Sequence, residues 1–324
     1  MLLMDRCQVA IKQEAAAGTP EALAAANVVI TTDRPTWEPT AEFTERNVLT
    51  KSFSPRGAVV GARMAKISFK QYLSGTTGAP TSINEAPWAI PFRGCGMDVV
   101  YSGTTPNEIG TWAPSMSQIV DTTTGVYCTV AAYRDGKQYK IHGAVGDMTL
   151  TFKRGVPVLA EYSFTGQYNT PTDIALLSPT YPAVVEPPFL GATLTVLTFS
   201  AKIDTLVVKL NNKIAMRPSP NTLSGYFSAQ VTDRKPTFTI DPEEELAGTK
   251  DWFNEWITGA TGSVTTGVFP SNGSNYNQFN LTIPKAQYTK PSQSDRDGVS
   301  VIGIEGTCVA NSDAGDDEFT FVQT

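Results

Sequence analysis

The sequence has few residues of the kinds that carry out acid–base or metal chemistry. Among its 324 residues it has one histidine, and its four cysteines are scattered without any C-x-x-C pair; these residues are His142, Cys7, Cys95, Cys128 and Cys308. A metal site with two histidine ligands is excluded, and a Ser-His-Asp centre is disfavoured. The cysteine spacing predicts neither a zinc site nor a disulfide framework. We expect a structural histidine in a strand and buried, reduced thiols.

Long apolar runs and an excess of positive charge are also absent. No apolar stretch reaches the length of a membrane span, and the opening MLLM reaches Asp5 and Arg6 too soon for a signal peptide. We therefore expect synthesis in the cytosol and no membrane partner. The net charge of -6 and the pI near 5.0 argue against tight binding of nucleic acid, which needs a basic surface. With 41% hydrophobic and 17% charged residues, the chain is a soluble one, long enough for two cores.

Short motifs that could bind an ion or a phosphate are incomplete. Residues 295–298, DRDG, lack the final glutamate of a calcium loop and predict a type I′ turn instead. Residues 94–96, GCG, have no phosphate-binding continuation and predict the end of a helix. Three glutamates at 243–245 predict the acidic first turn of another helix. The sequence thus predicts no catalytic residue, metal or cofactor, and we expect no enzyme; a hydrolase with two converging carboxylates ranks third among the possible functions.

Most segments have the pattern of β-strands. Residues 126–133 and 138–141 flank Asp135-Gly136, which is a strong signal for a β-hairpin. Apolar residues alternate with polar ones over 148–152 and again over 156–164, as in half-buried strands. Strands are therefore expected through most of the chain.

Several segments suggest that one structural unit is written twice. GVPVLAEYSFTG at 155–166 is similar to GVSVIGIEGTCV at 298–309, and KISF at 66–69 is similar to PTFT at 236–239. Each copy also contains one helix candidate, at 86–95 and at 243–257. We expect a mainly β fold of two tandem, duplicated β-domains, each with a short flanking helix. The predicted domains are residues 1–170 and 192–324, joined by a stiff, proline-rich linker over 171–191.

Residues 33–63 form a stretch rich in proline, glycine and arginine, with a counterpart at 211–225. We expect a long loop here. Loops of this length are usually functional, so the segment either docks on another molecule or folds back on its own domain.

Short segments spread over nearly the whole chain carry a resemblance to a known family. None is a catalytic signature; they are IKQE at 11–14, GTP at 18–20, ERN at 45–47, PRG at 55–57, the linker from PTD at 171–173 to PPFLG at 187–191, PKAQY at 284–288, DRDG at 295–298 and GDDE at 315–318. In these segments the chain resembles the major tail tube protein of long-tailed bacteriophages with non-contractile tails, of the two-domain type.

The resemblance implies β-sandwich or split-barrel domains, six of which form a β-barrel ring around a lumen. Three two-domain chains would then make a trimer with pseudo-sixfold symmetry, and stacked rings would form the conduit through which the genome reaches the host. The implied location is the phage tail of the virion, after a period in the host cytoplasm. The implied partners are other copies of the chain, the tail terminator, tape measure and distal tail proteins, and phage DNA that passes without tight binding.

Within this reading, the 33–63 segment is the candidate contact between rings, through Phe53, Arg56, Val59 and Val60. An acidic lumen wall would repel DNA weakly, and the candidate residues are Asp295, Asp297, Asp316 and Asp317. A solvated turn and tail is the alternative for this acidic group.

A carbohydrate-binding β-protein with two domains is the alternative function. Its sugar-stacking platforms would be found among the five tryptophans, Trp37, Trp88, Trp112, Trp252 and Trp256. Aromatic side chains in β-domains more often belong to the core.

Overall fold

The fold is mainly β, as the sequence predicts. A computed structural model describes residues 3–46, 48–52, 54, 56–103, 108–118, 125–181, 183–273 and 275–324. In chain order the strands are β1 Cys7–Gln13, β2 Val28–Val29, β3 Thr36–Thr44, β4 Val59–Tyr72, β5 Met97–Ser102, β6 Ile109–Pro114, β7 Cys128–Arg134, β8 Lys137–Lys153, β9 Leu159–Tyr168, β10 Thr172–Asp173, β11 Thr195–Val196, β12 Thr205–Lys209, β13 Asn212–Pro218, β14 Tyr226–Arg234, β15 Thr237–Ile240, β16 Thr261–Thr265, β17 Phe279–Arg296, β18 Val299–Val309 and β19 Thr320–Gln323. The helices are α1 Ala89–Gly94, α2 Trp252–Thr258 and the short 3-10 turns η1 Ala25–Asn27 and η2 Met116–Gln118.

The two hairpin turns expected from Asp-Gly pairs are present. Asp135 and Gly136 connect β7 to β8 with φ angles of 39° and 96°, and Asp297 and Gly298 connect β17 to β18 with 53° and 85°. Two consecutive positive φ angles are the mark of the type I′ turn, whose twist matches that of the flanking strands.

Both helices are shorter than the sequence predicts. The candidate at 86–95 is helical only in α1, and the candidate at 243–257 only in its last part, α2. The glutamate segment is not a helix because its backbone continues a sheet: Glu243 bridges to Val301, and the N–H of Glu244 donates to the Ser300 carbonyl. The helix α2 begins only after Asp251, whose side chain caps it by accepting from the Asn254 N–H.

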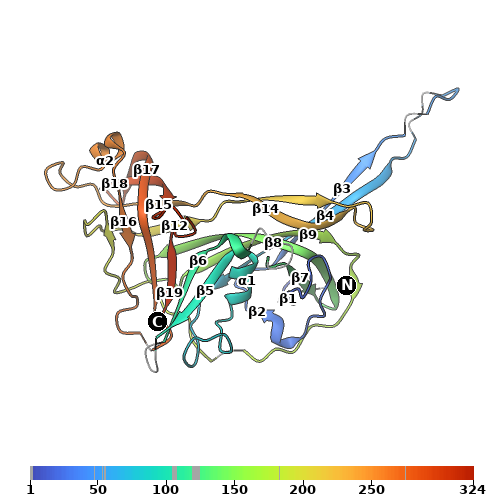
Figure 1. Ribbon diagram of the computed structural model, residues 1–324, viewed down its shortest axis with the longest axis horizontal. Helices are drawn as coiled ribbons and strands as arrows, with labels where there is room; N and C mark the ends of the chain where they lie inside the picture. Colours follow the sequence, from blue (N-terminus) through green and yellow to red (C-terminus); the bar gives the residue numbers. More distant parts are fainter. Residues whose placement is uncertain are drawn as a thin grey trace.

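The expected long loop at 33–63 is mostly a β-hairpin, which corrects that prediction. Strands β3 and β4 pair from Thr36 opposite Ser68 out to Thr44 opposite Val59, and together they project from the body as an arm (Figure 1). Pro39 lies within β3 and makes a strand hard to predict there. It is tolerated because β3 is an edge strand that pairs only with β4 among the described residues.

The core contains side chains from both predicted domains. Trp88 of the first half lies 5.6 Å from Phe321 and 6.3 Å from Phe279 between ring centroids, and all three are fully buried. The halves also share backbone ladders, between β8 and β12 and between β6 and β19. The division into two domains at 171–191 stays a prediction. The two halves share both core side chains and backbone ladders.

The first part of the proline-rich segment between them lies against the first half, and its end also contacts the second half through Val185 and Phe189. Leu177 exchanges two hydrogen bonds with the Gln8 side chain of β1, at 2.9 and 3.0 Å. Apart from the two residues of β10, its described part has neither helix nor strand before the single bridges at Pro188 and Phe189.

Candidate assembly surface

The order of paired strands in the first half recurs in the second. In the first half each strand pairs with the next in the order β7, β8, β9, β4, β3, and in the second half the order is β16, β17, β18, β15, β12. All these pairs are antiparallel. A short helix follows the fourth strand of each series, α1 after β4 and α2 after β15. The two series therefore have the same connectivity around the same kind of sheet.

The two series join through one ladder. Strand β8 is long enough to pair with β7 through its first part and with β12 through its last part. The pairs run from Thr149 opposite Lys209 to Lys153 opposite Thr205. Eight strands, from β3 to β17, thus form one continuous antiparallel series.

One face of this series is buried and the other is polar. Residues such as Ile67, Leu150 and Phe238 point into the core, while their neighbours along each strand point outward. The outward residues are mostly hydroxyl-bearing or charged: Lys66, Ser68, Lys70, Asp147, Thr149, Thr151, Lys153, Glu161, Ser163, Thr205, Lys209, Thr237, Thr239, Lys290, Ser292, Ser294, Glu305 and Thr307. Both signs of charge are present, and Lys70 pairs with Glu161 at 2.6 Å. We call this the polar face.

A second hairpin crosses one end of the polar face. Strands β13 and β14 continue from β12 and lead into β15, in the place that the outer end of the arm has between β3 and β4. The hairpin lies across β8 and β9 (Figure 1). Ala229 and Val231 of β14 form a small apolar cluster with Tyr127 and Val145. This hairpin is therefore packed against the chain's own first half, whereas the end of the arm projects beyond the body.

The residues predicted to contact the next ring lie on the arm. Phe53 lies outside the described residues. Arg56 is exposed, and Val59 and Val60 are 55% and 53% exposed at the start of β4. The structure adds Phe43, which faces Val60 across the arm and is 66% exposed. Sequence reasoning missed Phe43 because the segment was expected to be a loop, in which strand partners cannot be assigned.

The four acidic residues predicted for the lumen do not come together. Asp295 lies near the end of β17 and Asp297 in the turn before β18, and Asp316 and Asp317 lie in the segment after β18. The full length of β18 separates the two pairs. Asp316 accepts hydrogen bonds from Arg234 and from the Met116 N–H, both at 2.8 Å. A hydrogen bond from Ser312 lowers the pKa of Asp317. Asp316 is thus held by residues distant in the sequence, and Asp317 by the neighbouring Ser312.

Three of the five tryptophans are core residues and cannot stack on a sugar. Trp88, Trp112 and Trp252 are at most 1% exposed, and the Trp88 Nε1–H donates to the Ser74 carbonyl at 2.8 Å. Trp37 packs on Tyr139 with ring centroids 4.8 Å apart, which leaves Trp256, 41% exposed on α2.

The residues with acid–base potential are placed structurally. The Asn169 Nδ2–H donates to His142 Nδ1 at 2.8 Å, and burial, with a smaller effect of Lys140, lowers the pKa of His142 to about 4. Three of the four free cysteines are buried and Cys7 is partly exposed. Burial raises the pKa of the Cys308 thiol to about 12, as expected for an unreactive thiol.

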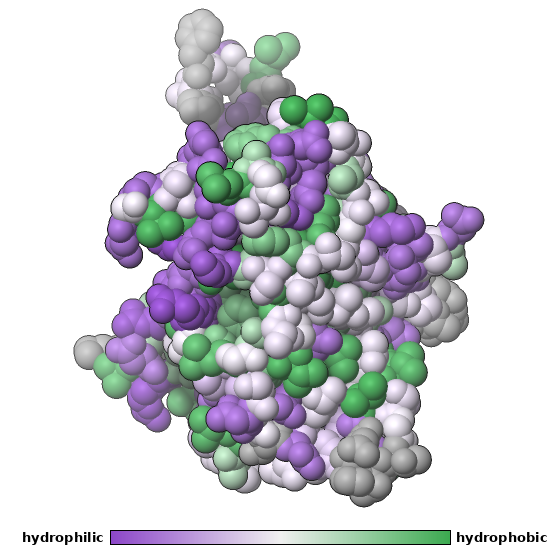
Figure 2. Space-filling view, turned by 90° about the vertical axis from the view of Figure 1, so that its left-hand side faces the viewer, coloured by the Kyte–Doolittle hydropathy of each residue, from purple (hydrophilic) through white to green (hydrophobic). Residues whose placement is uncertain are grey.

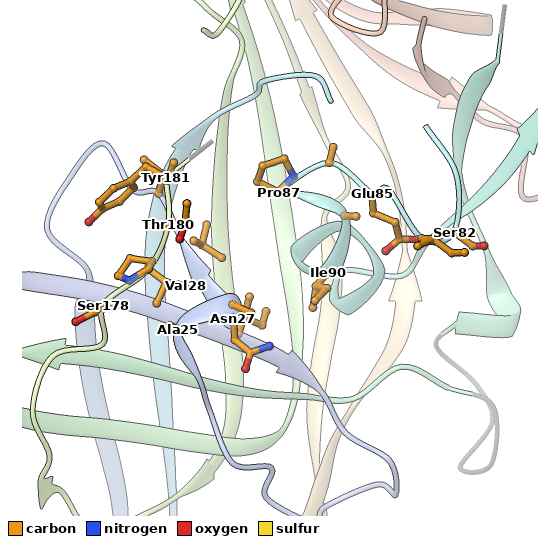
Figure 3. A pocket seen from close by; sticks show the side chains of 18 residues that line it. Ala25, Asn27, Val28, Ser82, Glu85, Pro87, Ile90, Ser178, Thr180 and Tyr181 are labelled. Carbon is orange, nitrogen blue, oxygen red and sulfur yellow. The ribbon is translucent and has the colours of Figure 1, made fainter. Parts of the chain in front are cut away.

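A cavity of about 540 Å³ lies between the first 3-10 turn, α1 and the proline-rich segment (Figure 3). Asn27, Ile90 and Tyr181 come from these three elements and line it. Glu85 is the one carboxylate among the described lining residues, and it is already paired with Arg93. The cavity therefore offers no group of converging titratable side chains.

Figure 2 shows the end of the molecule formed by β16 to β18 and α2. Hydrophilic and hydrophobic side chains are interspersed over this face. Exposed apolar side chains here include Leu246, Trp256, Ile257 and Val299. Neither α1 nor α2 is long and apolar enough to cross a membrane, and no other helix of the described residues is a candidate.

The comparisons with known proteins agree with this architecture. A family model described as phage tail tube protein matches residues 4–308. No individual protein in the curated comparison matched the chain. Because the family match covers nearly all of the sequence, the chain belongs to the phage tail tube protein family.

Proposed function

We propose that the protein is the structural subunit of stacked rings that form a phage tail tube, the conduit for genome delivery. The observation that carries the proposal is the junction between β8 and β12, through which one series of strands continues directly into a second series of the same order. A fold that extends its sheet in this way within one chain is suited to extending it between chains. Three chains would then supply six units to a closed ring.

The polar face would line the lumen. Its threonine and serine hydroxyls are neutral. Of its five lysines, Lys70 pairs with Glu161, Lys290 lies opposite Glu305 and Lys66 interacts electrostatically with Asp147, which leaves a surplus of two positive charges on the face. Tight binding of DNA needs many uncompensated cations, so this face would let DNA slide. The acidic residues Asp295 and Asp297 would sit at one rim of the barrel wall, at the β17–β18 turn.

The arm would provide the axial contact between rings. Its exposed apolar residues Phe43, Val59 and Val60, together with Arg56, lie beyond the body of the subunit and have no partner surface within the described chain. Phe53 is assigned to the same contact from the sequence.

Removal of residues 52–61, with a short Gly-Ser turn in their place, tests the stacking role. We expect a folded protein with unchanged circular dichroism that forms rings but no tubes in negative-stain images. Tubes of normal length from this variant would refute the role of the arm, while wild-type protein that forms neither rings nor tubes would refute the proposed function.

In the virion, the tube would contact the tail terminator at one end, distal tail proteins at the other and the tape measure protein inside. Before assembly, the subunit would reside in the host cytoplasm. Phage DNA would be a passing cargo without a binding site of its own.

A further inference from the structure

We infer that neighbouring copies join edge to edge, with β3 of one copy paired to the last part of β17 of the next, and with Trp37 directly opposite Gln293. The partner is a second copy of this chain. The inference rests on the proposed tail tube function and adds to it the strands and the register of the contact.

The first step concerns the unpaired edges of β17 and β3. Each corresponds to a strand edge that is already paired in the ladder between β8 and β12, which we call the internal junction. Strand β17 is covered by β19 and β16 only as far as Gln287, and beyond it pairs with β18 alone. Residues 290–296 therefore have one unpaired edge. This part of β17 corresponds to the part of β8 that pairs with β12. At the other end of the series β3 takes the place of β12, and it pairs only with β4.

The second step fixes how the two halves match. The β4–β9 ladder ends with the bond from the Leu73 N–H to the Val158 carbonyl, and the β15–β18 ladder ends with the bond from the Glu244 N–H to the Ser300 carbonyl, both at 2.9 Å. The β4–β9 ladder has nine pairs, and the β15–β18 ladder has four and continues through the bridge between Glu243 and Val301. We take the two ends as equivalent points, which matches Val158 with Ser300 and corrects by one residue the match of 155–166 with 298–309 suggested by the sequence.

Counting back from these ends matches β3 to β12. Six residues before Leu73 lies Ile67, which faces Trp37, and six residues before Glu244 lies Phe238, which faces Val208. Trp37 in the first half thus takes the place of Val208 in the second.

Counting in the other direction matches β8 to β17. Ala160, two residues after the first ladder end, faces Leu150, and Ile302, two residues after the second, faces Gln293. Leu150 and Gln293 are therefore equivalent. Because Leu150 lies directly opposite Val208 in the internal junction, Gln293 is expected opposite Trp37 of the next copy.

The third step is that the backbone groups at these positions point the right way. In the internal ladder the Leu210 N–H donates to the Met148 carbonyl, so the pair Val208–Leu150, two residues along, also exchanges hydrogen bonds. The equivalent residues must therefore each present an outward N–H and C=O.

Trp37 does so. The Arg63 N–H donates to Ser224, away from β3, and every second residue of β4, including Ile67, is directed the same way. Trp37, opposite Ile67, consequently has no ladder bond to β4 and directs both backbone groups to the open edge.

Gln293 does so as well. The Ile302 N–H donates to the Pro242 carbonyl, away from β17, so Gln293, opposite Ile302, has its N–H and C=O on the open side of the sheet. Pro291 and Pro39 share this outward orientation and lack an N–H. In the proposed register they lie opposite each other, so this position of the ladder makes no hydrogen bond and the full exchange of bonds is at Trp37 and Gln293.

Disulfide trapping reads the register directly. Thr36 and Ser294 are exposed, and in the proposed ladder they are opposite each other in a pair without hydrogen bonds, where Cα atoms are about 4.5 Å apart. We would combine Thr36→Cys with Ser294→Cys in a Cys7→Ser background and assemble tubes under mild oxidation. The matched controls are Thr36→Cys with Ser292→Cys and Glu38→Cys with Ser294→Cys, which correspond to slips of two residues in either direction.

We expect covalent oligomers up to the closed ring on non-reducing gels from the first pair and little from the controls. Normal tubes without cross-linking of the first pair would overturn this inference and leave the tail tube function standing. Failure of the wild-type protein to form rings or tubes would overturn both.

A proline substitution provides a second test. Gln293→Pro removes the outward N–H but no bond to β18, so the variant is expected to fold with a melting temperature close to that of the wild type and to lose tube formation. Gln293→Ala keeps the N–H and should assemble normally. Wild-type yields of tubes from Gln293→Pro would contradict the proposed pairing.

Discussion

At the scale of single residues, the core is closely packed where α1 meets the sheet. A Cβ atom on Gly94 would lie 2.7 Å from Cε1 of Phe164 and 2.9 Å from Sγ of Cys128, both buried. We expect Gly94→Ala to lower the free energy of unfolding by about 1–3 kcal/mol, because a close-packed core does not accept an extra methyl group without displacement. Urea denaturation measures this, with Gly248→Ala as the control, since nothing lies within 4 Å of that position. Equal stability of the two variants would show that α1 is loosely packed.

His142 gives the protein a defined pH dependence. Its pKa is about 4 in the folded chain and near 6.5 when free, so the unfolded chain binds a proton in this range that the folded chain does not. Its contribution to stability is complete above pH 6.5 and is lost as the pH falls toward 4, with a slope of up to about 1.4 kcal/mol per pH unit. His142→Asn should remove this part of the dependence, because no other histidine is present. Identical stability-versus-pH curves for both proteins would refute the shift.

The roles of individual residues were predictable from the sequence where residue type and spacing alone determine them. The isolation of His142 and the scattering of the cysteines suffice to predict structural roles, and burial of Cys95, Cys128 and Cys308 agrees with that. The partners of Asp316 were not predictable, because Arg234 and Met116 are brought to it only by the tertiary fold.

At the scale of elements, α2 begins later than the glutamates at 243–245 predict, because that segment pairs with β18. We expect Asp251→Ala to cost about 1 kcal/mol, because the side chain caps the first turn by accepting from Asn254. Glu245→Ala is the control. It would be destabilising only if the helix began at 243, as the sequence suggested, so its stability should stay within about 0.5 kcal/mol of the wild type. Urea denaturation of both variants separates the two helix starts.

Hairpins with Asp-Gly turns were the most predictable elements, because the turn residues and the alternation of apolar positions agree. The arm was not predictable. Its strand β3 contains Pro39 and has only Ala41 and Trp37 partly buried, so it lacks the alternation that identifies a strand. Pairing with β4 makes it a strand, and that pairing is a property of the fold.

At the scale of the whole molecule, the halves share a core and a ladder. We therefore expect a single cooperative unfolding transition in calorimetry, with a van't Hoff enthalpy equal to the calorimetric one. Breaking the junction with Val208→Pro, which removes a ladder N–H between β12 and β8, should destabilise the entire chain by about 3 kcal/mol or more. Two separate transitions in the wild type would instead favour the independent domains 1–170 and 192–324 suggested by the sequence.

The prolines on the two open edges have a consequence for the subunit before assembly. Pro39 on β3, Pro35 just before it and Pro291 on β17 reduce the number of N–H groups on each edge, and such edges are poor templates for the nonspecific strand addition that leads to aggregation. With the proposed pairing, we therefore expect free subunits to resist nonspecific association, because growth requires the few N–H donors of both edges to meet their acceptors together.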